Sequence, residues 1–253
     1  MLRALLERHV VPDIVVGSSV GALNGVFVAA DPTAAGVERM VDTWTSIAHR
    51  GVLAGSVLER VRTLVRGRTY LHSNDGLRSL LDGRLGPLRF EDLPVHFECI
   101  AASIERACGQ WFRTGPVTDA VLASCAVPGL LPAVEIGGEH YFDGGLVSSV
   151  PVGRAVTIGA RRIFVLHVGR LEQPLRAPAT PWQVGLVAFE IARRHQFGDD
   201  MARVPDGIEV HVLPAGTDAP ALSVRYRRAS DIPERISAAH AAASEFLDRV
   251  LTQ

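Results

Sequence analysis

Hydrophobic residues along the chain form short β-branched runs that alternate with longer stretches of helical periodicity. The short runs are typical of buried strands, which we place at residues 10–16, 96–103, 162–168 and 208–213. The longer stretches predict helices at residues 1–9, 22–30, 36–49, 52–65, 118–125, 181–202 and 233–251. This alternation predicts an α/β fold with a mostly parallel sheet that helices cover on both faces.

Two shorter segments interrupt the alternation. Residues 134–142 are predicted to form a hairpin that turns at Gly137-Gly138, and residues 110–113 are placed to pair with the strand at 96–103. The sequence contains no internal repeat, low-complexity tract or clear linker. We therefore expect residues 1–253 to form a single domain.

The composition excludes several classes of protein. Hydrophobic residues make up 47% of the 253 residues and charged residues 21%, which is the balance of an ordinary globular protein. The formal net charge is −1, so no global positive field would attract nucleic acid. No apolar run approaches the roughly 18 residues that a membrane-spanning helix needs. No secretory leader is visible, so we expect a cytoplasmic protein.

The cysteines argue against a disulfide scaffold and against a zinc site. They are three in number, Cys99, Cys108 and Cys125, and no two of them have the CxxC spacing.

A candidate nucleophile lies between the first predicted strand and the helix at 22–30. The segment Gly17-Ser18-Ser19-Val20-Gly21 has the pattern of a nucleophile elbow, a sharp turn that exposes a serine hydroxyl. Small residues at positions 17 and 21 are expected to keep the backbone from colliding with itself. The backbone amide of Val20 and the start of the helix would face a developing oxyanion. The alternative is a strand-to-helix turn that only packs.

A candidate proton acceptor follows the predicted hairpin. Asp143-Gly144-Gly145 comes 124 residues after Ser19, and a carboxylate bonded to a serine hydroxyl can act as its general base. The alternative is an ordinary Asp-Gly turn. An α/β-hydrolase triad is disfavoured, because only one strand precedes Ser19 and no later histidine has a distinctive context.

Together these features resemble the patatin-like phospholipase family. The matching pieces are GSSVG at 17–21, DGG at 143–145 and the stretch Ala123–Pro128 with Pro132 beyond it, within about residues 1–170. The resemblance implies a three-layer α/β/α fold and hydrolysis of lipid ester bonds through an acyl-enzyme. It implies Ser19 as nucleophile, Asp143 as proton acceptor and the Val20 amide as an oxyanion donor, with Gly17, Gly21, Gly144 and Gly145 as motif glycines. It implies no metal and no organic cofactor.

One departure from the family concerns the start of the sequence. Patatin-like proteins carry a glycine-rich loop of the GGGxxG type between a first strand and the first helix, and this loop supplies further oxyanion amides. This sequence opens at Met1 in what corresponds to that helix. We therefore expect the chain as it stands to be weakly active or inactive, through either a misplaced start or a real loss.

The substrate expected from the resemblance is a lipid or another acyl ester. The segment Val52–Arg68 is basic and amphipathic, so peripheral contact with an anionic membrane is one interpretation, and a surface helix packed on the sheet is the other. Two alternatives to hydrolysis stay open. One is a non-catalytic lipid-binding or regulatory protein, and the other is acyl transfer to an alcohol by the same two residues.

Overall fold

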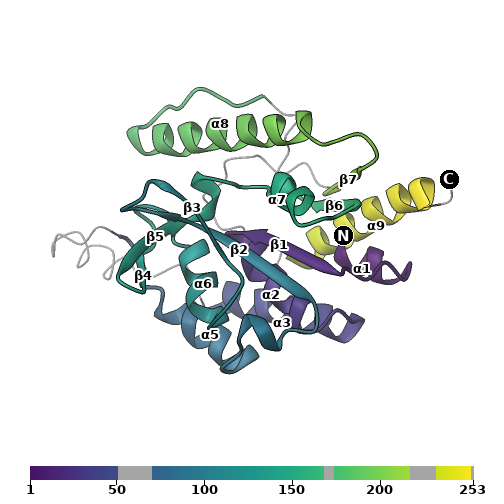
Figure 1. Ribbon diagram of the computed structural model, residues 1–253, viewed down its shortest axis with the longest axis horizontal. Coiled ribbons are helices and arrows are strands. Elements are labelled where there is room, and N and C mark those ends of the chain that lie inside the picture. The colour runs from purple at the N-terminus through teal and green to yellow at the C-terminus, as the bar shows by residue number, and fades with distance from the viewer. Residues whose placement is uncertain (51–69, 168–173, 217–231, 252–253) are drawn as a thin grey trace. The chain divides into compact units, whose positions relative to one another are not determined.

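The computed structural model describes residues 1–50, 70–167, 174–216 and 232–251 of the chain. The chain separates into two compact units, one made of residues 12–149 and the other of residues 1–11 together with the chain from residue 150 onward. Helices alternate with strands in both units (Figure 1), which confirms the predicted α/β class. The predicted helix at 52–65 and the basic segment Val52–Arg68 lie outside the described residues.

The unit of residues 12–149 is built on a sheet whose central strand is β2 (His96–Ser103). Strand β1 (Ile14–Ser18) pairs with β2 in parallel, whereas the remaining pairs are antiparallel. The predicted hairpin at 134–142 is confirmed, as is the pairing of the segment near 110–113 with β2. The antiparallel strands are β3 (Cys108–Phe112), β4 (Val134–Ile136) and β5 (Glu139–Asp143).

Strands β1 and β5 share one edge of β2 and point toward each other. Ile100 of β2 pairs with Ser18 and with Trp111, so β1 and β3 lie on opposite edges of β2. The next residue, Ala101, pairs with Asp143 of β5, again opposite β3. Since β1 runs parallel to β2 and β5 runs antiparallel, their carboxyl ends meet beside Ile100 and Ala101.

Helices cover one face of this sheet (Figure 1). Phe97, Cys99 and Ala101 alternate along β2, and all three are buried against side chains of α2 and α6. This period of two shows which face of β2 the helices cover. The helices of this unit are α2 (Val20–Ala30), α3 (Ala34–Arg50), α5 (Asp75–Leu85) and α6 (Val117–Ser124), with a short 3₁₀ helix at Phe90–Asp92.

Helix α5 was not predicted from the sequence. Its buried contacts come from Leu77 and Leu81, which lie four residues apart on one face. Gly76 and Gly83 lie within the helix and lower its intrinsic helical propensity. Tertiary packing of the leucine face therefore decides the conformation of this segment.

The second unit contains a parallel pair of strands, β6 (Arg162–Leu166) and β7 (Glu209–Leu213). Leu5 packs with Leu213 and Leu247 in one apolar cluster, which joins the start of the chain to the last helix. The guanidinium of Arg8 donates to the carboxylate of Asp248 at 2.8 Å and reinforces this contact. The helices are α1 (Leu2–Leu6), α7 (Val152–Thr157), which the sequence did not predict, α8 (Pro181–Ala202) and α9 (Ile232–Leu251).

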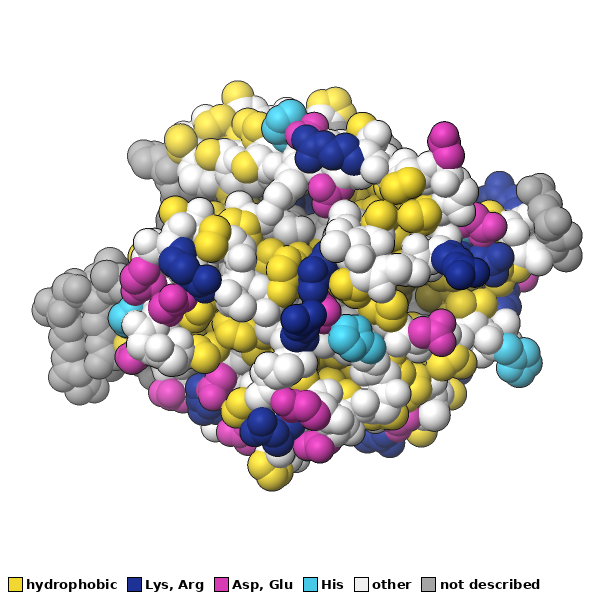
Figure 2. Space-filling view, in the orientation of Figure 1, with side chains coloured by type: hydrophobic (Ala, Val, Ile, Leu, Met, Phe, Trp, Pro, Cys, Tyr) yellow, Lys and Arg dark blue, Asp and Glu magenta, His cyan; other side chains and the backbone are white. Residues whose placement is uncertain are grey.

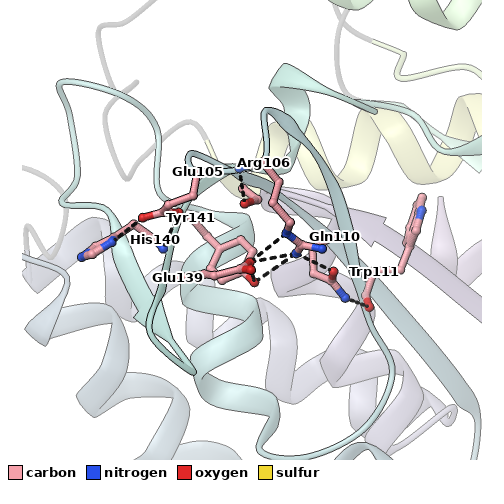
Figure 3. A network of polar contacts seen from close by, with 8 residues as sticks. Glu105, Arg106, Gln110, Trp111, Glu139, His140 and Tyr141 are labelled. Carbon is pink, nitrogen blue, oxygen red and sulfur yellow. Dashed lines mark hydrogen bonds and ion pairs between the residues drawn. The ribbon is translucent and has the colours of Figure 1, made fainter.

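A polar network fastens β5 to the turn between β2 and β3 (Figure 3). The guanidinium of Arg106 donates to Glu139 Oε2 at 3.0 Å, and the Tyr141 hydroxyl donates to the same oxygen at 2.7 Å. Glu105 accepts from the backbone N–H of His140 at 2.9 Å and contacts its ring Nδ1 at 2.7 Å. Because Tyr141 is two residues before Asp143, the network holds the strand that presents this carboxylate.

The charged side chains of the surface and the polarity of the helices bear on the partners of the protein. Among the described residues drawn in Figure 2, arginine side chains and acidic side chains are interspersed. Within the described ranges, every helix is too short or too polar to cross a bilayer.

Candidate active site

Ser19 occupies a strained turn between β1 and α2. Its backbone has φ 54° and ψ −124°, a conformation that costs a residue with a side chain on the order of 1–3 kcal/mol. A Cβ atom on residue 17 would lie 2.5 Å from the carbonyl oxygen of Gly21, so only glycine fits at position 17. The turn therefore has the geometry of a nucleophile elbow, with the Ser19 side chain partly exposed.

Gly21 does not have the steric role that the sequence analysis expected. A Cβ atom built on this residue meets no described atom within 4 Å. The crowding in the elbow is one-sided: the missing side chain of Gly17 makes room for the backbone of Gly21, whereas a side chain at position 21 would enter open space. The expectation that both glycines prevent a backbone collision was therefore wrong for Gly21.

The hydroxyl of Ser19 donates a hydrogen bond to Asp143, with 2.5 Å between Ser19 Oγ and Asp143 Oδ2. The two residues are 124 positions apart in the sequence, and β2 brings them together because the carboxyl ends of β1 and β5 meet along its edge. The other carboxylate oxygen, Oδ1, accepts from the backbone N–H of Gly145 at 2.7 Å. The carboxylate is therefore held in one orientation, with Oδ2 directed at the serine.

Burial makes Asp143 a stronger base than an ordinary aspartate. Only 1% of the residue is exposed, and this desolvation raises the pKa of its carboxyl group to about 6. The hydrogen bonds from Ser19 and from Gly145 act in the opposite direction, because they stabilise the ionised form. The carboxylate is thus ionised at neutral pH and has an increased affinity for a proton.

The first glycine after Asp143 allows the chain to pass close to β2. A Cβ atom on residue 144 would lie 2.1 Å from the carbonyl oxygen of Ile100, so glycine is required there. Residues Gly144–Leu146 form a short 3₁₀ helix that Asp143 caps by accepting from the Gly145 N–H. The DGG motif thus combines one close backbone approach with one hydrogen bond to the carboxylate.

The Val20 amide lies at the first position of α2, directly after Ser19. Backbone N–H groups in the first turn of a helix lack acceptors within that helix, and the helix dipole makes this end positive. The Ser19 carbonyl accepts from the amides of Ala22 and Leu23 at 2.9 and 3.1 Å. The Val20 amide therefore belongs to the first turn of α2, which begins directly after the serine.

The last residue of α6 and the turn that follows it contact both members of the pair, which the sequence did not predict. The backbone N–H of Ser19 donates to Ser124 Oγ at 3.0 Å, and the backbone N–H of Asp143 donates to the carbonyl of Ala126 at 2.9 Å. In the sequence, the stretch Ala123–Pro128 stands out only through its resemblance to a family motif. Nothing in its local pattern identifies which distant amides it would bind.

Exposed apolar side chains lie next to both residues in the sequence. Val20 is 43% exposed and directly follows Ser19, and Leu146 is 43% exposed and lies three residues after Asp143. Among the described residues, no group of three or more His, Cys, Asp or Glu side chains is arranged to hold a metal ion.

Comparison with known proteins identifies related sequences. A family model described as patatin-like phospholipase matches residues 1–156. A patatin-like phospholipase domain-containing protein of Caenorhabditis elegans is 31% identical over 183 residues, which cover 68% of this chain and 12% of that protein. A lysophospholipase of Emericella nidulans is 30% identical over 173 residues, or 68% of this chain and 11% of that protein.

A bacterial relative is matched over a larger share of its own length than the nematode and fungal relatives are. An uncharacterized NTE family protein of Mycobacterium tuberculosis is 27% identical over 172 residues, which cover 63% of this chain and 42% of that protein. This chain therefore matches less than half of the bacterial relative and only a small part of the nematode and fungal ones.

Proposed function

This chain belongs to the patatin-like phospholipase family, and from that premise we propose that it is a serine lipid acyl hydrolase. In this proposal it cleaves carboxylic ester bonds of lipids through an acyl-enzyme on Ser19, with Asp143 as proton acceptor. The observation that carries the proposal is the 2.5 Å hydrogen bond from Ser19 Oγ to a buried, oriented carboxylate.

In the acylation step, Ser19 Oγ attacks the carbonyl carbon of the ester while its proton moves to Asp143 Oδ2. The carbonyl oxygen becomes an oxyanion, which the Val20 N–H and the positive end of α2 stabilise. When the tetrahedral intermediate collapses, the bond to the leaving alcohol breaks, and Asp143 returns the proton to the alcohol oxygen. The acyl group is then bound to Ser19 as an ester.

In the deacylation step, water takes the place of the serine hydroxyl as nucleophile. Asp143 accepts a proton from the water molecule as its oxygen attacks the acyl carbon. The second tetrahedral intermediate releases Ser19 Oγ, which takes the proton back from Asp143. The products are a fatty acid and the free enzyme, so one carboxylate is the proton carrier in both steps.

The substrate class is proposed from two further observations. A relative from Emericella nidulans is named as a lysophospholipase. The side chains of Val20 and Leu146 follow Ser19 and Asp143 by one and three residues in the sequence and are exposed, and exposed apolar surface of this kind would favour contact with an acyl chain. A lipid with a long acyl chain therefore fits the site better than a small polar ester.

Release of fatty acid from lysophosphatidylcholine micelles tests this proposal, with Ser19→Ala as the inactive variant. A matched control is Ser18→Ala, because the Ser18 hydroxyl is buried next to the nucleophile and has no hydrogen-bond partner among the described residues. We expect the Ser19 variant to lose turnover and the Ser18 variant to keep it. Turnover that survives Ser19→Ala would contradict the proposal.

An added alcohol separates hydrolysis from acyl transfer. If water is the acceptor, the product in the presence of ethanol remains mainly the free fatty acid. Accumulation of the ethyl ester in its place would assign the protein to acyl transfer with the same two residues.

A further inference from the structure

We propose that Ser124 is a positioning residue for the Ser19–Asp143 pair, and that the turn Ser124–Ala126 sets the separation of the two reacting oxygens. This inference rests on the proposed function and deepens it. It assigns a role to the end of α6 and the turn that follows it, which have no part in the chemical steps described above.

The first contact in this turn holds the backbone of the nucleophile. Ser124 is completely buried, and its Oγ accepts the backbone N–H of Ser19 at 3.0 Å. Strand β1 ends at Ser18, so the Ser19 amide lies beyond the ladder that β1 forms with β2. A serine hydroxyl near the end of a helix commonly bonds to a carbonyl of its own helix, whereas this one accepts from another element.

The second contact reaches the same residue from its carbonyl side. The thiol of Cys125 donates to the carbonyl oxygen of Ser19 at 3.1 Å. Burial raises the pKa of this thiol well above its ordinary value, and the nearby Asp143 carboxylate acts in the same direction. Cys125 therefore stays protonated, so it is a hydrogen-bond donor and not a competing nucleophile.

The third contact holds the acid. The carbonyl of Ala126 accepts the backbone N–H of Asp143 at 2.9 Å. Three consecutive residues thus bind the amide of Ser19, the carbonyl of Ser19 and the amide of Asp143. A short turn with such contacts ties the end of β1 to the end of β5 independently of their pairing with β2.

The consequence for the reaction follows from the strained backbone of Ser19. Because this residue holds φ 54°, it stays there only where surrounding contacts favour that conformation over relaxed ones. Without the Ser124 hydroxyl, the Ser19 amide loses its acceptor, and the elbow can relax away from Asp143. A displacement of about 1 Å at a reacting atom typically costs about 100-fold in rate.

The variants Ser124→Ala and Ser124→Cys test this role, with Ser18→Ala as the control for loss of a buried hydroxyl. We expect Ser124→Ala to lower kcat on a p-nitrophenyl ester by about 10- to 100-fold while KM changes less than about twofold. Ser124→Cys keeps a side chain of similar size with a weaker acceptor, so its kcat should fall between alanine and wild type. Ser18→Ala should retain the wild-type kcat.

A second readout is independent of turnover. Hydrogen exchange at the Ser19 amide, followed by NMR in the native protein, should be faster in Ser124→Ala and unchanged in Ser18→Ala. Exchange at amides of β6 and β7 should stay at the wild-type rate, which separates a local effect from global loss of stability. If Ser124→Ala does not fold, Ser124→Cys provides both measurements.

The outcomes distinguish this inference from the proposed function. Wild-type kcat and wild-type exchange at Ser19 in the Ser124 variants would overturn the positioning role while the activity of the protein stands. If Ser19→Ala leaves the hydrolysis unchanged, the proposed function fails, and the exchange rate at Ser19 then decides whether Ser124 anchors the elbow.

Discussion

A side chain on Gly17 would place its Cβ atom 2.5 Å from the carbonyl oxygen of Gly21, whereas a side chain on Gly21 would meet no described atom within 4 Å. The two glycines of one motif therefore differ in their steric roles. The first makes room for the sharp turn at Ser19, and the second lies at the exposed start of α2.

This difference predicts opposite effects for two alanine substitutions. Gly17→Ala should lower the free energy of unfolding by about 3 kcal/mol, because backbone atoms must move to accept the new methyl group. Gly21→Ala should leave it unchanged or raise it by up to about 1 kcal/mol, since alanine favours a helix over glycine. Urea unfolding followed by circular dichroism measures both, and equal losses would refute the one-sided crowding.

The pKa of Asp143 predicts the pH dependence of the rate. Burial raises this pKa to about 6, and the protonated carboxyl cannot accept the proton of Ser19. We therefore expect kcat/KM to rise with pH through an apparent pKa of about 6 and to become constant above about pH 7. Measurements of kcat/KM with a p-nitrophenyl ester between about pH 4.5 and about pH 8 test this pH dependence. A profile that is flat from about pH 4.5 upward would contradict it.

The same pKa predicts how stability changes with pH. Because the folded-state pKa of Asp143 lies above the ordinary value of 3.8, the folded protein binds the proton more tightly than the unfolded chain. The contribution of this group to stability is present below about pH 4 and is lost as the pH rises through about 6. The loss is on the order of 3 kcal/mol, and Asp143→Asn should not show it.

Unfolding of the wild type and of Asp143→Asn at several pH values measures this linkage. The difference in unfolding free energy should shift in favour of the asparagine variant between about pH 4 and 7. A shift in favour of the wild type over that range would mean that the pKa of Asp143 is lowered, not raised.

The burial of the cysteines predicts their reactivity. Cys108 is exposed, whereas Cys99 and Cys125 are buried, and burial raises the pKa of both buried thiols. A thiol reagent such as DTNB should modify Cys108 rapidly in the native protein and all three cysteines in denaturant. Rapid modification of Cys125 in the native state would contradict the burial of this thiol against the carbonyl of Ser19.

Long, regular elements were predictable from the sequence. The strand at 96–103 and the helix at 181–202 have the predicted bounds, because their residue patterns agree with their tertiary environment. The hairpin turn at Gly137-Gly138 was also predictable, since both glycines adopt the positive φ that such turns require. Helix α7 was missed because only six residues form it, too few to establish a period.

The candidate site was predictable only in part. Ser19 and Asp143 stand in local patterns with a chemical meaning, a serine in a sharp turn and a carboxylate before two glycines. Ser124 has no such pattern, because its partner depends on where the end of α6 meets the end of β1. A contact of this kind depends on the whole sheet and is therefore visible only in three dimensions.

The most direct test of the account is to locate the residue that reacts with a fluorophosphonate probe, by peptide mapping and mass spectrometry. We expect a single adduct on Ser19, no adduct at that peptide in Ser19→Ala, and labelling slowed by about 100-fold or more in Asp143→Asn. Labelling of Asp143→Asn at the wild-type rate, or an adduct on a different residue, would contradict the proposed pairing of this serine with this carboxylate.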